Sequence, residues 1–534
     1  MNDQLDTLRE KVTSGLMTRR EFVARAAALG VTAAMANAML AAEARADAHA
    51  KPVAGGTFRM GVQGGESTNT QDPASWASDV PIAIGQLWGE TLVTTTPEGP
   101  LEPLVAESWE GSADAKTWTF KIRQGCTFST GAQVTAEDVL KTMERHSNED
   151  SKSGALGIMK GIESMSAEGD KFIVNLAVGN ADLPYLMADY HLMIQPGGGF
   201  DDPGAAIGTG AYVMESYEPG VRASATRRAD YWGGSQEEVA HYDRVEVIVL
   251  NDATARTAAL QSGQVDTINR VEPKIAKLLD RAPNLSVQNV SGRGHYVFIA
   301  HIDTAPFDNN DLRLALKYAL NRQEMVDKIL QGYGGIGNDM PINAAYPLFD
   351  DTIPQREFDL EKAKEHYAKS GHDGSPIILR TADGAFPGAV DAASLFQQSA
   401  QAAGIPLEIK REPNDGYWSE VWNVQPFCCS YWGGRPVQDQ MYTTAYLSTA
   451  DWNDTRWKRE DFDAMLLEAR AELDEAKRKE IYSQMGRMLR EEGGLILPMF
   501  NDFIDAVSNE VQGFEGDPNG PQMGWYAFKR TWKA

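Results

Sequence analysis

The chain has 534 residues and a formal net charge of −25, with 42% hydrophobic and 9% aromatic residues. This composition is ordinary for a globular protein and excludes an intrinsically disordered chain. The acidic balance argues against a nucleic-acid partner, whose phosphates require a basic surface. The length exceeds what one hydrophobic core can organise, so we expect two or three lobes.

The first 50 residues predict an export signal. Thr18 to Val23 reads TRREFV and resembles the twin-arginine motif, and an alanine-rich apolar run over 26–42 follows it. The run is too short and too rich in alanine for a stable membrane span. Small-x-small sequences place signal cleavage near Ala46 or Ala50. The alternative interpretation is a cytosolic amphipathic helix, but the combined pattern predicts a soluble periplasmic protein.

The cysteines are Cys126, Cys428 and Cys429. Adjacent cysteines rarely bond to each other because the ring is strained, so we expect no disulfide framework and a fold held by its core. None lies near the signal, so a lipid anchor on an N-terminal cysteine has no support. Cys428 and Cys429 lack partners at metal-ligand spacing, and we expect neither a metal site nor a cofactor.

The beginning of the mature chain predicts a short strand within 52–60, a polar glycine-rich loop over 61–76 and a helix near Pro81. A more informative stretch follows. Apolar and polar residues alternate through 118–122, which predicts a half-buried strand. A helix then begins at Thr135, where TAED has the pattern of a capping box.

The middle of the chain contains a GTGAY segment at 208–212, which two apolar stretches precede. Gly263 has the position of a helix C-cap, and Asp266 is expected to begin a strand that crosses toward the next lobe. The other elements of this region are apolar stretches 172–177 and 183–194, a RADYWG element at 228–233, a strand over 245–250 and a helix over 253–262.

Helical spacing of apolar residues predicts a helix over 312–322 in the last part of the chain. A βαβ-like unit is expected after it, from strand to helix to strand. The elements are a helix over 359–371, the βαβ-like unit (377–381, 390–402, 407–410), helices within 461–490, a strand over 495–500 and a tail over 525–532.

The order of these segments, and PLVAESWEGSADAKTWTFKIRQGCTFSTGAQVTAEDV at 103–139 above all, closely resembles the periplasmic solute-binding proteins of the dipeptide/oligopeptide/nickel type. The resemblance covers essentially the whole mature chain. It implies an α/β, two-lobed periplasmic binding protein of type II-like architecture, in the large peptide-binding subclass. Such a protein has an inserted subdomain and a hinged cleft between its lobes.

The resemblance also implies a division of the chain. Residues 1–50 are the twin-arginine signal peptide, and the first lobe is discontinuous. Residues 95–205 form the inserted subdomain and residues 298–500 the second lobe. The first lobe consists of 52–94, 206–297 and 501–534.

The implied function is that of the substrate-binding component of an ABC importer. The protein would be a monomer that captures a small peptide or another carboxylate-bearing solute and delivers it to the membrane permease. A receptor for a metal chelate or an opine-like amino-acid derivative is the alternative. An exported cofactor enzyme is the rival class, but the glycine-rich segment at 332–337 follows a helix and predicts a loop, not a nucleotide site.

The candidate ligand site is Tyr431-Trp432-Gly433-Gly434-Arg435-Pro436. Peptide receptors of the resembled family carry an aspartate where this chain has Arg435, and that aspartate pairs with the α-ammonium group of the peptide. An arginine should invert the preference, because it offers donors and cannot bind a cation. Arg435 could clamp a ligand carboxylate, pair with a cleft acid such as Asp439, or face solvent. Asp439 could also restore an amine site.

Aromatic residues with polar tips suit a binding cleft, and Trp418, Tyr431 and Trp432 are candidates. Trp452 and Trp457 are expected to belong to the core of the second lobe. The loop residues Ser67, Thr68 and Asn69 could donate hydrogen bonds to a ligand, or could belong to an ordinary surface loop.

Overall fold

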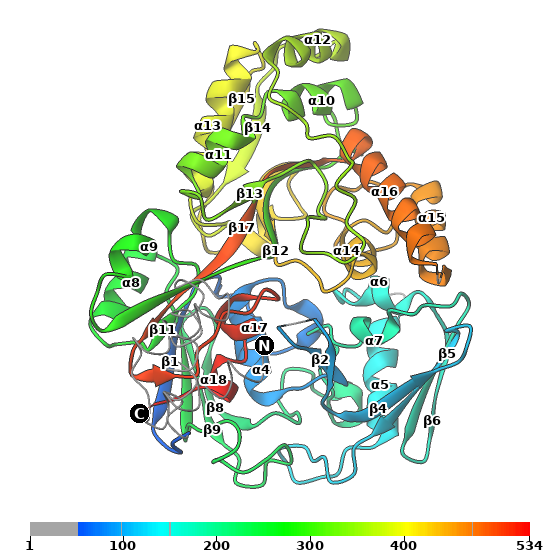
Figure 1. The fold of residues 1–534 in the computed structure, drawn as a ribbon, viewed down its shortest axis with the longest axis vertical. Helices are drawn as coiled ribbons and strands as arrows, with labels where there is room; N and C mark the ends of the chain where they lie inside the picture. Colours follow the sequence, from blue (N-terminus) through cyan, green and yellow to red (C-terminus); the bar gives the residue numbers. More distant parts are fainter. Residues whose placement is uncertain (1–51, 98, 149–150, 473, 534) are drawn as a thin grey trace, which may run out of the picture.

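The computed structural model describes residues 52–533, apart from residues 98, 149, 150 and 473. The predicted signal and its cleavage sites near Ala46 and Ala50 lie outside this range. Within the described residues, none of the helices combines the length and the apolar character that a membrane span requires. The chain forms a mixed α/β structure (Figure 1).

A sheet of 11 strands runs through the molecule (Figure 1). Its main path, in sheet order, is β15 (Leu407–Arg411), β14 (Ile377–Thr381), β16 (Phe427–Trp432), β12 (Leu285–Ala300), β17 (Leu495–Ser508), β11 (Thr267–Ile268), β1 (Thr57–Val62), β10 (Arg244–Val249), β9 (Arg222–Arg227) and β8 (Tyr212–Glu218). β13 (Gly334–Ile336) pairs with β17 beside this path. The segment 332–337, predicted as a loop, therefore contains a short strand.

The upper part of Figure 1, which we call the upper lobe, contains β13 to β16 and a set of helices. These are α10 (Asn310–Tyr318), α11 (Arg322–Lys328), α12 (Leu360–Ser370), α13 (Ala389–Ala402), α14 (Gln438–Ala445), α15 (Glu460–Ala471) and α16 (Glu475–Glu492). The predicted βαβ unit is confirmed, because β14 and β15 are parallel and α13 connects them. The helix predicted over 312–322 is divided, since Asn321 caps a new helix by accepting a hydrogen bond from the Glu324 backbone.

The lower lobe contains β1 and β8 to β11. Its helices are α4 (Asp79–Trp88), α8 (Ala253–Gln261), α9 (Pro273–Leu279), α17 (Pro521–Gly524) and α18 (Ala527–Arg530). Its smaller elements are the 3₁₀ turn at Pro73–Ser75 and two strand pairs, β2 (Val93–Thr95) with β3 (Leu101–Pro103) and β18 (Val511–Gln512) with β19 (Trp532–Lys533). Gly263 has φ of 72° just after α8, as expected of a residue that ends a helix.

A second sheet of four strands lies in the region predicted to be an inserted subdomain. Its order is β4 (Ala106–Gly111), β5 (Thr117–Ile122), β7 (Lys171–Leu176) and β6 (Ile162–Glu168). The accompanying helices are α5 (Ala136–Ser147), α6 (Leu156–Met159), α7 (Leu183–Leu186) and the turn Pro196–Gly199. The capping box predicted at Thr135 is confirmed, with reciprocal bonds to Asp138.

β12 and β17 connect the two lobes (Figure 1). They have 16 and 14 residues and pair antiparallel along most of their length. The predicted boundaries at 297/298 and 500/501 fall inside these strands, and the lobe limits stay predictions. Asp266 does not begin the crossing strand, because β11 after it has two residues. The crossing is made by β12 instead.

Candidate ligand-binding site

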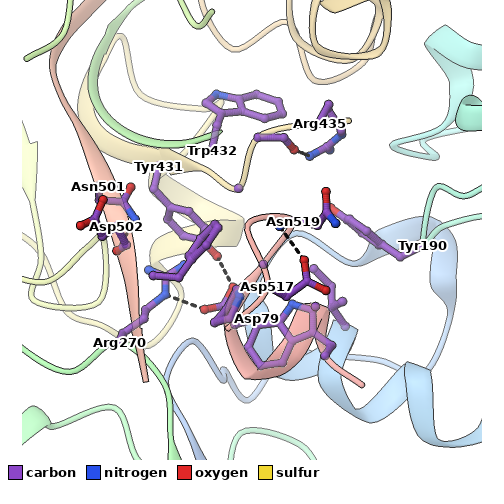
Figure 2. A pocket seen from close by; sticks show the side chains of 18 of the residues that line it. Asp79, Tyr190, Arg270, Tyr431, Trp432, Arg435, Asn501, Asp502, Asp517 and Asn519 are labelled. Atoms are coloured by element: carbon purple, nitrogen blue, oxygen red, sulfur yellow. Dashed lines mark hydrogen bonds and ion pairs between the residues drawn. The ribbon is translucent and has the colours of Figure 1, made fainter. Parts of the chain in front are cut away.

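A cavity of about 210 Å³ lies where the two lobes meet (Figure 2). Residues of α4 and the segment from Asp517 through α17 to Tyr526 line it from the lower lobe, and the end of β16 lines it from the upper lobe. Asp189 and Tyr190, which follow α7, close a third side. All three parts of the chain therefore meet at this cavity.

The end of β16 determines how Arg435 reaches the cavity. β16 pairs antiparallel with β12, with Trp432 opposite His295. Gly434 then has φ of 85°, and a Cβ atom there would lie 2.4 Å from the Cβ of Arg293. Only glycine fits this left-handed, crowded position. The turn places Arg435 among the residues that line the cavity.

The guanidinium group of Arg435 is buried but poorly paired. Its Nη1 donates to the Gly434 carbonyl at 2.7 Å, and its Nε lies 3.9 Å from a carboxylate oxygen of Asp189. Among the described residues, Nε and Nη2 have no hydrogen-bond partner, although the side chain is only 9% exposed. Buried unpaired donors cost about 1–3 kcal/mol each. The site therefore favours a bound acceptor.

Asp189 supplies negative charge behind Arg435. It is buried, and its Oδ1 lies 2.5 Å from His191 Nδ1. Burial acts to raise the pKa of Asp189, but His191 and, more weakly, Arg435 outweigh burial and lower this pKa to about 2. The carboxylate is thus ionised, and its shortest contact is with His191 instead of Arg435.

Asp439 lies elsewhere. It is the second residue of α14, where its Oδ1 accepts a hydrogen bond from Arg470 Nε at 2.6 Å, and both side chains are buried. It does not line the cavity. The expectation that Asp439 pairs with Arg435 or faces a ligand is corrected, because its carboxylate is committed to Arg470 of α15.

Arg270 is the second cavity arginine, and it is closely paired with an acidic residue. Its Nε lies 2.5 Å from Asp79 Oδ2, at the first turn of α4. Its guanidinium lies 3.7 Å from the ring centroid of Tyr431, whose hydroxyl donates to Asp79 Oδ1 at 3.2 Å (Figure 2). Tyr431, predicted as a ligand contact, lines the cavity and also joins the upper lobe to the lower one.

An aromatic wall faces these charges. Trp418, Trp422, Trp432 and Trp452 line the cavity and contact one another edge to face, with ring centroids 5.4–6.3 Å apart. Trp422 and Trp432 both donate through Nε1 to Asp454, at 3.0 and 3.2 Å. Burial raises the pKa of Asp454 to about 7.

The tryptophans predicted as core residues differ. Trp457 is 1% exposed and packs in the core of the upper lobe, as expected. Trp452 belongs to the same core but also lines the cavity. Trp418, on the π-helical turn Tyr417–Val421, lines this cavity and a second one of about 210 Å³.

The predicted loop residues Ser67, Thr68 and Asn69 lie outside the main cavity. Thr68 and Asn69 line the second cavity behind Trp418. The hydroxyl of Ser67 donates to Asp415 at 3.0 Å, and Glu66 accepts a bond from the Trp418 backbone at 2.8 Å. This loop therefore joins the two lobes instead of lining the space next to Arg435.

Sequence reasoning missed several residues of the cavity, including Asp79, Asp189, Tyr190, Arg270 and Asp502. The position of Asp79 at the start of a helix is only weak evidence for a binding role, because acidic residues are common there for electrostatic reasons alone. The others come from three separate segments, and no spacing in the sequence connects them.

Known proteins resemble this chain in sequence and in fold. A family model described as bacterial extracellular solute-binding proteins, family 5 middle, matches residues 100–454. Di/tripeptide-binding protein 1 of Pseudomonas aeruginosa strain UCBPP-PA14 is 26% identical over 456 residues, which cover 78% of this chain and 84% of that protein.

Solved structures show the same fold. PBP AgaA from A. tumefaciens R10, in complex with agropinic acid, has a TM-score of 0.81 at 22% identity, covering 90% of this chain and 99% of that one. DppA from Helicobacter pylori, in complex with the peptide STSA, also has a TM-score of 0.81, at 19% identity, covering 90% and 98%. The two-lobed α/β fold predicted from the sequence is confirmed.

Proposed function

The chain belongs to the bacterial extracellular solute-binding proteins of family 5, and on that premise we propose that it captures a small carboxylate-bearing solute between its lobes. It would deliver this solute to the membrane permease of an ABC importer. The observation that carries the proposal is Arg435, with its two buried and unpartnered nitrogens at the cavity.

A carboxylate matches this arginine better than other groups do. Its two oxygens can accept from Nε and Nη2 side by side, which is the bidentate geometry that guanidinium groups prefer. The rings of Trp432 and Tyr190 have their centroids 5.8 Å from the guanidinium carbon, and the arginine side chain is buried. An ion pair in such surroundings is screened less than one at the surface.

The cavity volume limits the size of the solute. Sites for drug-sized ligands span about 300–1,000 Å³, and the cavity here has about 210 Å³. Bonds between the lobes, such as Ser67 to Asp415, hold the lobes together around it. These dimensions favour an amino-acid derivative, an opine-like compound or a dipeptide over a long peptide.

The compared proteins support this class. A relative is named for di- and tripeptides, and a structural neighbour is in complex with agropinic acid. Their names describe binding proteins, which supports a receptor and not an enzyme. Arg435 stands where the resemblance places an aspartate in peptide receptors, which supports recognition of a carboxylate instead of an α-ammonium group at that position.

Calorimetry with the purified mature protein tests the proposal. The probes are dipeptides, opine-type N-carboxyalkyl amino acids and nickel–histidine chelates, each carboxylate compared with its amide. We expect carboxylates to bind, and Arg435→Met to weaken them about 100-fold, since a charged hydrogen bond contributes roughly 1.5–3 kcal/mol.

The matched control is Arg222→Met, which removes an arginine whose side chain is 70% exposed. It should leave affinity unchanged. Equal affinity for carboxylate and amide probes, or an Arg435→Met protein that binds like wild type, would contradict the proposal.

We also infer export to the periplasm through the twin-arginine pathway, with cleavage near Ala46 or Ala50. The support is the TRREFV sequence and the small-x-small sites that follow it. Replacing Arg19 and Arg20 by lysine should retain the protein in the cytoplasm, and the N-terminal sequence of the periplasmic form would give the cleavage site.

A further inference from the structure

The carboxylates that line the cavity differ in their ion pairs. Asp79 lies 2.5 Å from Arg270, and Asp189 lies 3.9 Å from Arg435 and is hydrogen-bonded to His191. Asp502 lies on β17, on the side of the cavity away from Arg435 (Figure 2). Among the described residues, no lysine or arginine nitrogen lies within 4.0 Å of its carboxylate. Its negative charge is therefore not compensated by an ion pair.

Two neutral donors orient this carboxylate. Ser291 donates through its hydroxyl to Oδ1 at 2.8 Å, and Asn289 donates through its side-chain amide to Oδ2 at 3.0 Å. Both residues lie on β12, where Ser291 is directly opposite Asp502. A carboxylate has about four acceptor positions, so each oxygen retains capacity for a further donor.

Other groups of the cavity also lack donors. The side-chain oxygens of Gln86 and Gln440 are buried and have no partner within the described part of the chain. These acceptors require N–H or O–H groups, whereas Arg435 requires acceptors. The cavity therefore contains both donors and acceptors without partners among the described residues, and a purely anionic ligand would provide partners only for the donors.

We propose that Asp502 binds a cationic nitrogen of the ligand, so that the cavity selects a zwitterion with its ammonium group at β17 and its carboxylate at Arg435. This inference rests on the proposed function and adds the second recognition point. Asp517 also lines the cavity and lies 3.8 Å from Arg530. The order of charges is the reverse of that expected for an aspartate at position 435.

The position of Asp502 also connects recognition to closure. β12 and β17 join the lobes, and both contribute to this carboxylate site, one through Asp502 and the other through Ser291. A cation held there contacts the hinge strands, while the ligand carboxylate contacts Arg435 of the upper lobe. A ligand with both charges thus favours the closed arrangement more than a ligand with one.

The test compares three forms of the same amino-acid derivatives and dipeptides by calorimetry: the zwitterion, the N-acetyl form and the C-terminal amide. Wild type should bind the zwitterion about 10- to 100-fold more tightly than either other form. Asp502→Asn should reduce zwitterion affinity by a similar factor and bind the N-acetyl form as wild type does. Ser291→Ala, a milder change, should reduce only zwitterion affinity, by roughly 3- to 10-fold.

Asp201→Asn changes an exposed aspartate and is the matched control. If no zwitterion of the panel binds, or if N-acetyl forms bind wild type as tightly as zwitterions and Asp502→Asn changes nothing, the inference is overturned. The proposed function fails by a different result, namely equal affinity for the zwitterion and the amide, or no effect of Arg435→Met.

Discussion

Arg270 and Arg435 line the same cavity and differ in every contact that matters. Arg270 lies 2.5 Å from Asp79, and its guanidinium rests 3.7 Å from the ring of Tyr431. Arg435 lies 3.9 Å from Asp189 and has two nitrogens without partners in the described structure. The charge of Arg270 is closely paired within the protein, whereas that of Arg435 has only the longer contact with Asp189 among the described acidic residues.

This difference gives the two arginines different roles: Arg270 helps to hold the lobes together, and Arg435 is available to bind a ligand. Asp79 and Arg270 belong to the lower lobe and Tyr431 to the upper one, so their cluster holds the lobes together without any ligand. Burial opposes the charge of Arg270, but Asp79 more than compensates and the pKa of Arg270 is raised. Arg435 leaves donors unpaired at a cost that a ligand acceptor removes. A mutation should therefore affect stability at one arginine and affinity at the other.

Removing Arg270 should have the largest effect on stability. Arg270→Met leaves Asp79 as an uncompensated charge that is 8% exposed, and loss of one partner from a buried pair costs about 3–5 kcal/mol. Urea unfolding of the ligand-free protein measures this. The double variant Asp79→Asn, Arg270→Met should recover part of the loss, and a single variant as stable as wild type would contradict the assignment.

The pH dependence of the unfolding free energy tests the role of Asp454, which accepts hydrogen bonds from two tryptophans of the aromatic wall near Arg435. Burial raises its pKa to about 7, so the folded protein retains a proton that the unfolded chain releases near pH 4. Stability should therefore decrease as pH rises from about 4 to 7, by roughly 3 kcal/mol.

Asp454→Asn cannot ionise and should lack this loss. The difference in unfolding free energy between variant and wild type should grow in favour of the variant from pH 5 to pH 8. Parallel curves over that range would show that Asp454 is ionised throughout, and that Trp422 and Trp432 donate to a charged group.

Tyr431→Phe should have a smaller effect. It removes the hydroxyl bond to Asp79 at 3.2 Å but preserves the ring next to Arg270, and a single hydrogen bond contributes about 1 kcal/mol. Urea unfolding should show this loss. Tyr217→Phe is the matched control, because the Tyr217 hydroxyl is buried without a partner in the described structure. Equal effects of the two changes would remove Tyr431 from the closure cluster.

Local signals in the sequence predicted local structure well. Thr135 and Asp138 cap α5 because the pattern needs only four consecutive residues. Tyr431, Trp432 and Arg435 reach the cavity together because the first two end strand β16 and the third follows it after a glycine turn. Such features depend on residues that are neighbours in the chain, so a single sequence is enough to predict them.

Features that depend on distant segments could not be predicted. Asp439 seemed suitable because it lies four residues after Arg435, but the chain enters α14 at Gln438 and turns this carboxylate toward Arg470. Asp189 reaches Arg435 across 246 positions, from 189 to 435, through the packing of three parts of the fold. The identity of the crossing strand, which is β12 and not the strand after Asp266, likewise depends on how distant strands pair in the sheet.

The smallest effect on stability is expected at Arg435 itself, although its effect on affinity is large. Arg435→Met removes two buried donors that have no partner in the described structure, which favours folding. It also removes the attraction to Asp189, but that carboxylate retains His191 at 2.5 Å. The two terms oppose each other, so the unfolding free energy without ligand should change by less than about 1 kcal/mol. A loss as large as that of Arg270→Met would mean that Asp189 depends on Arg435, and that both arginines support the fold.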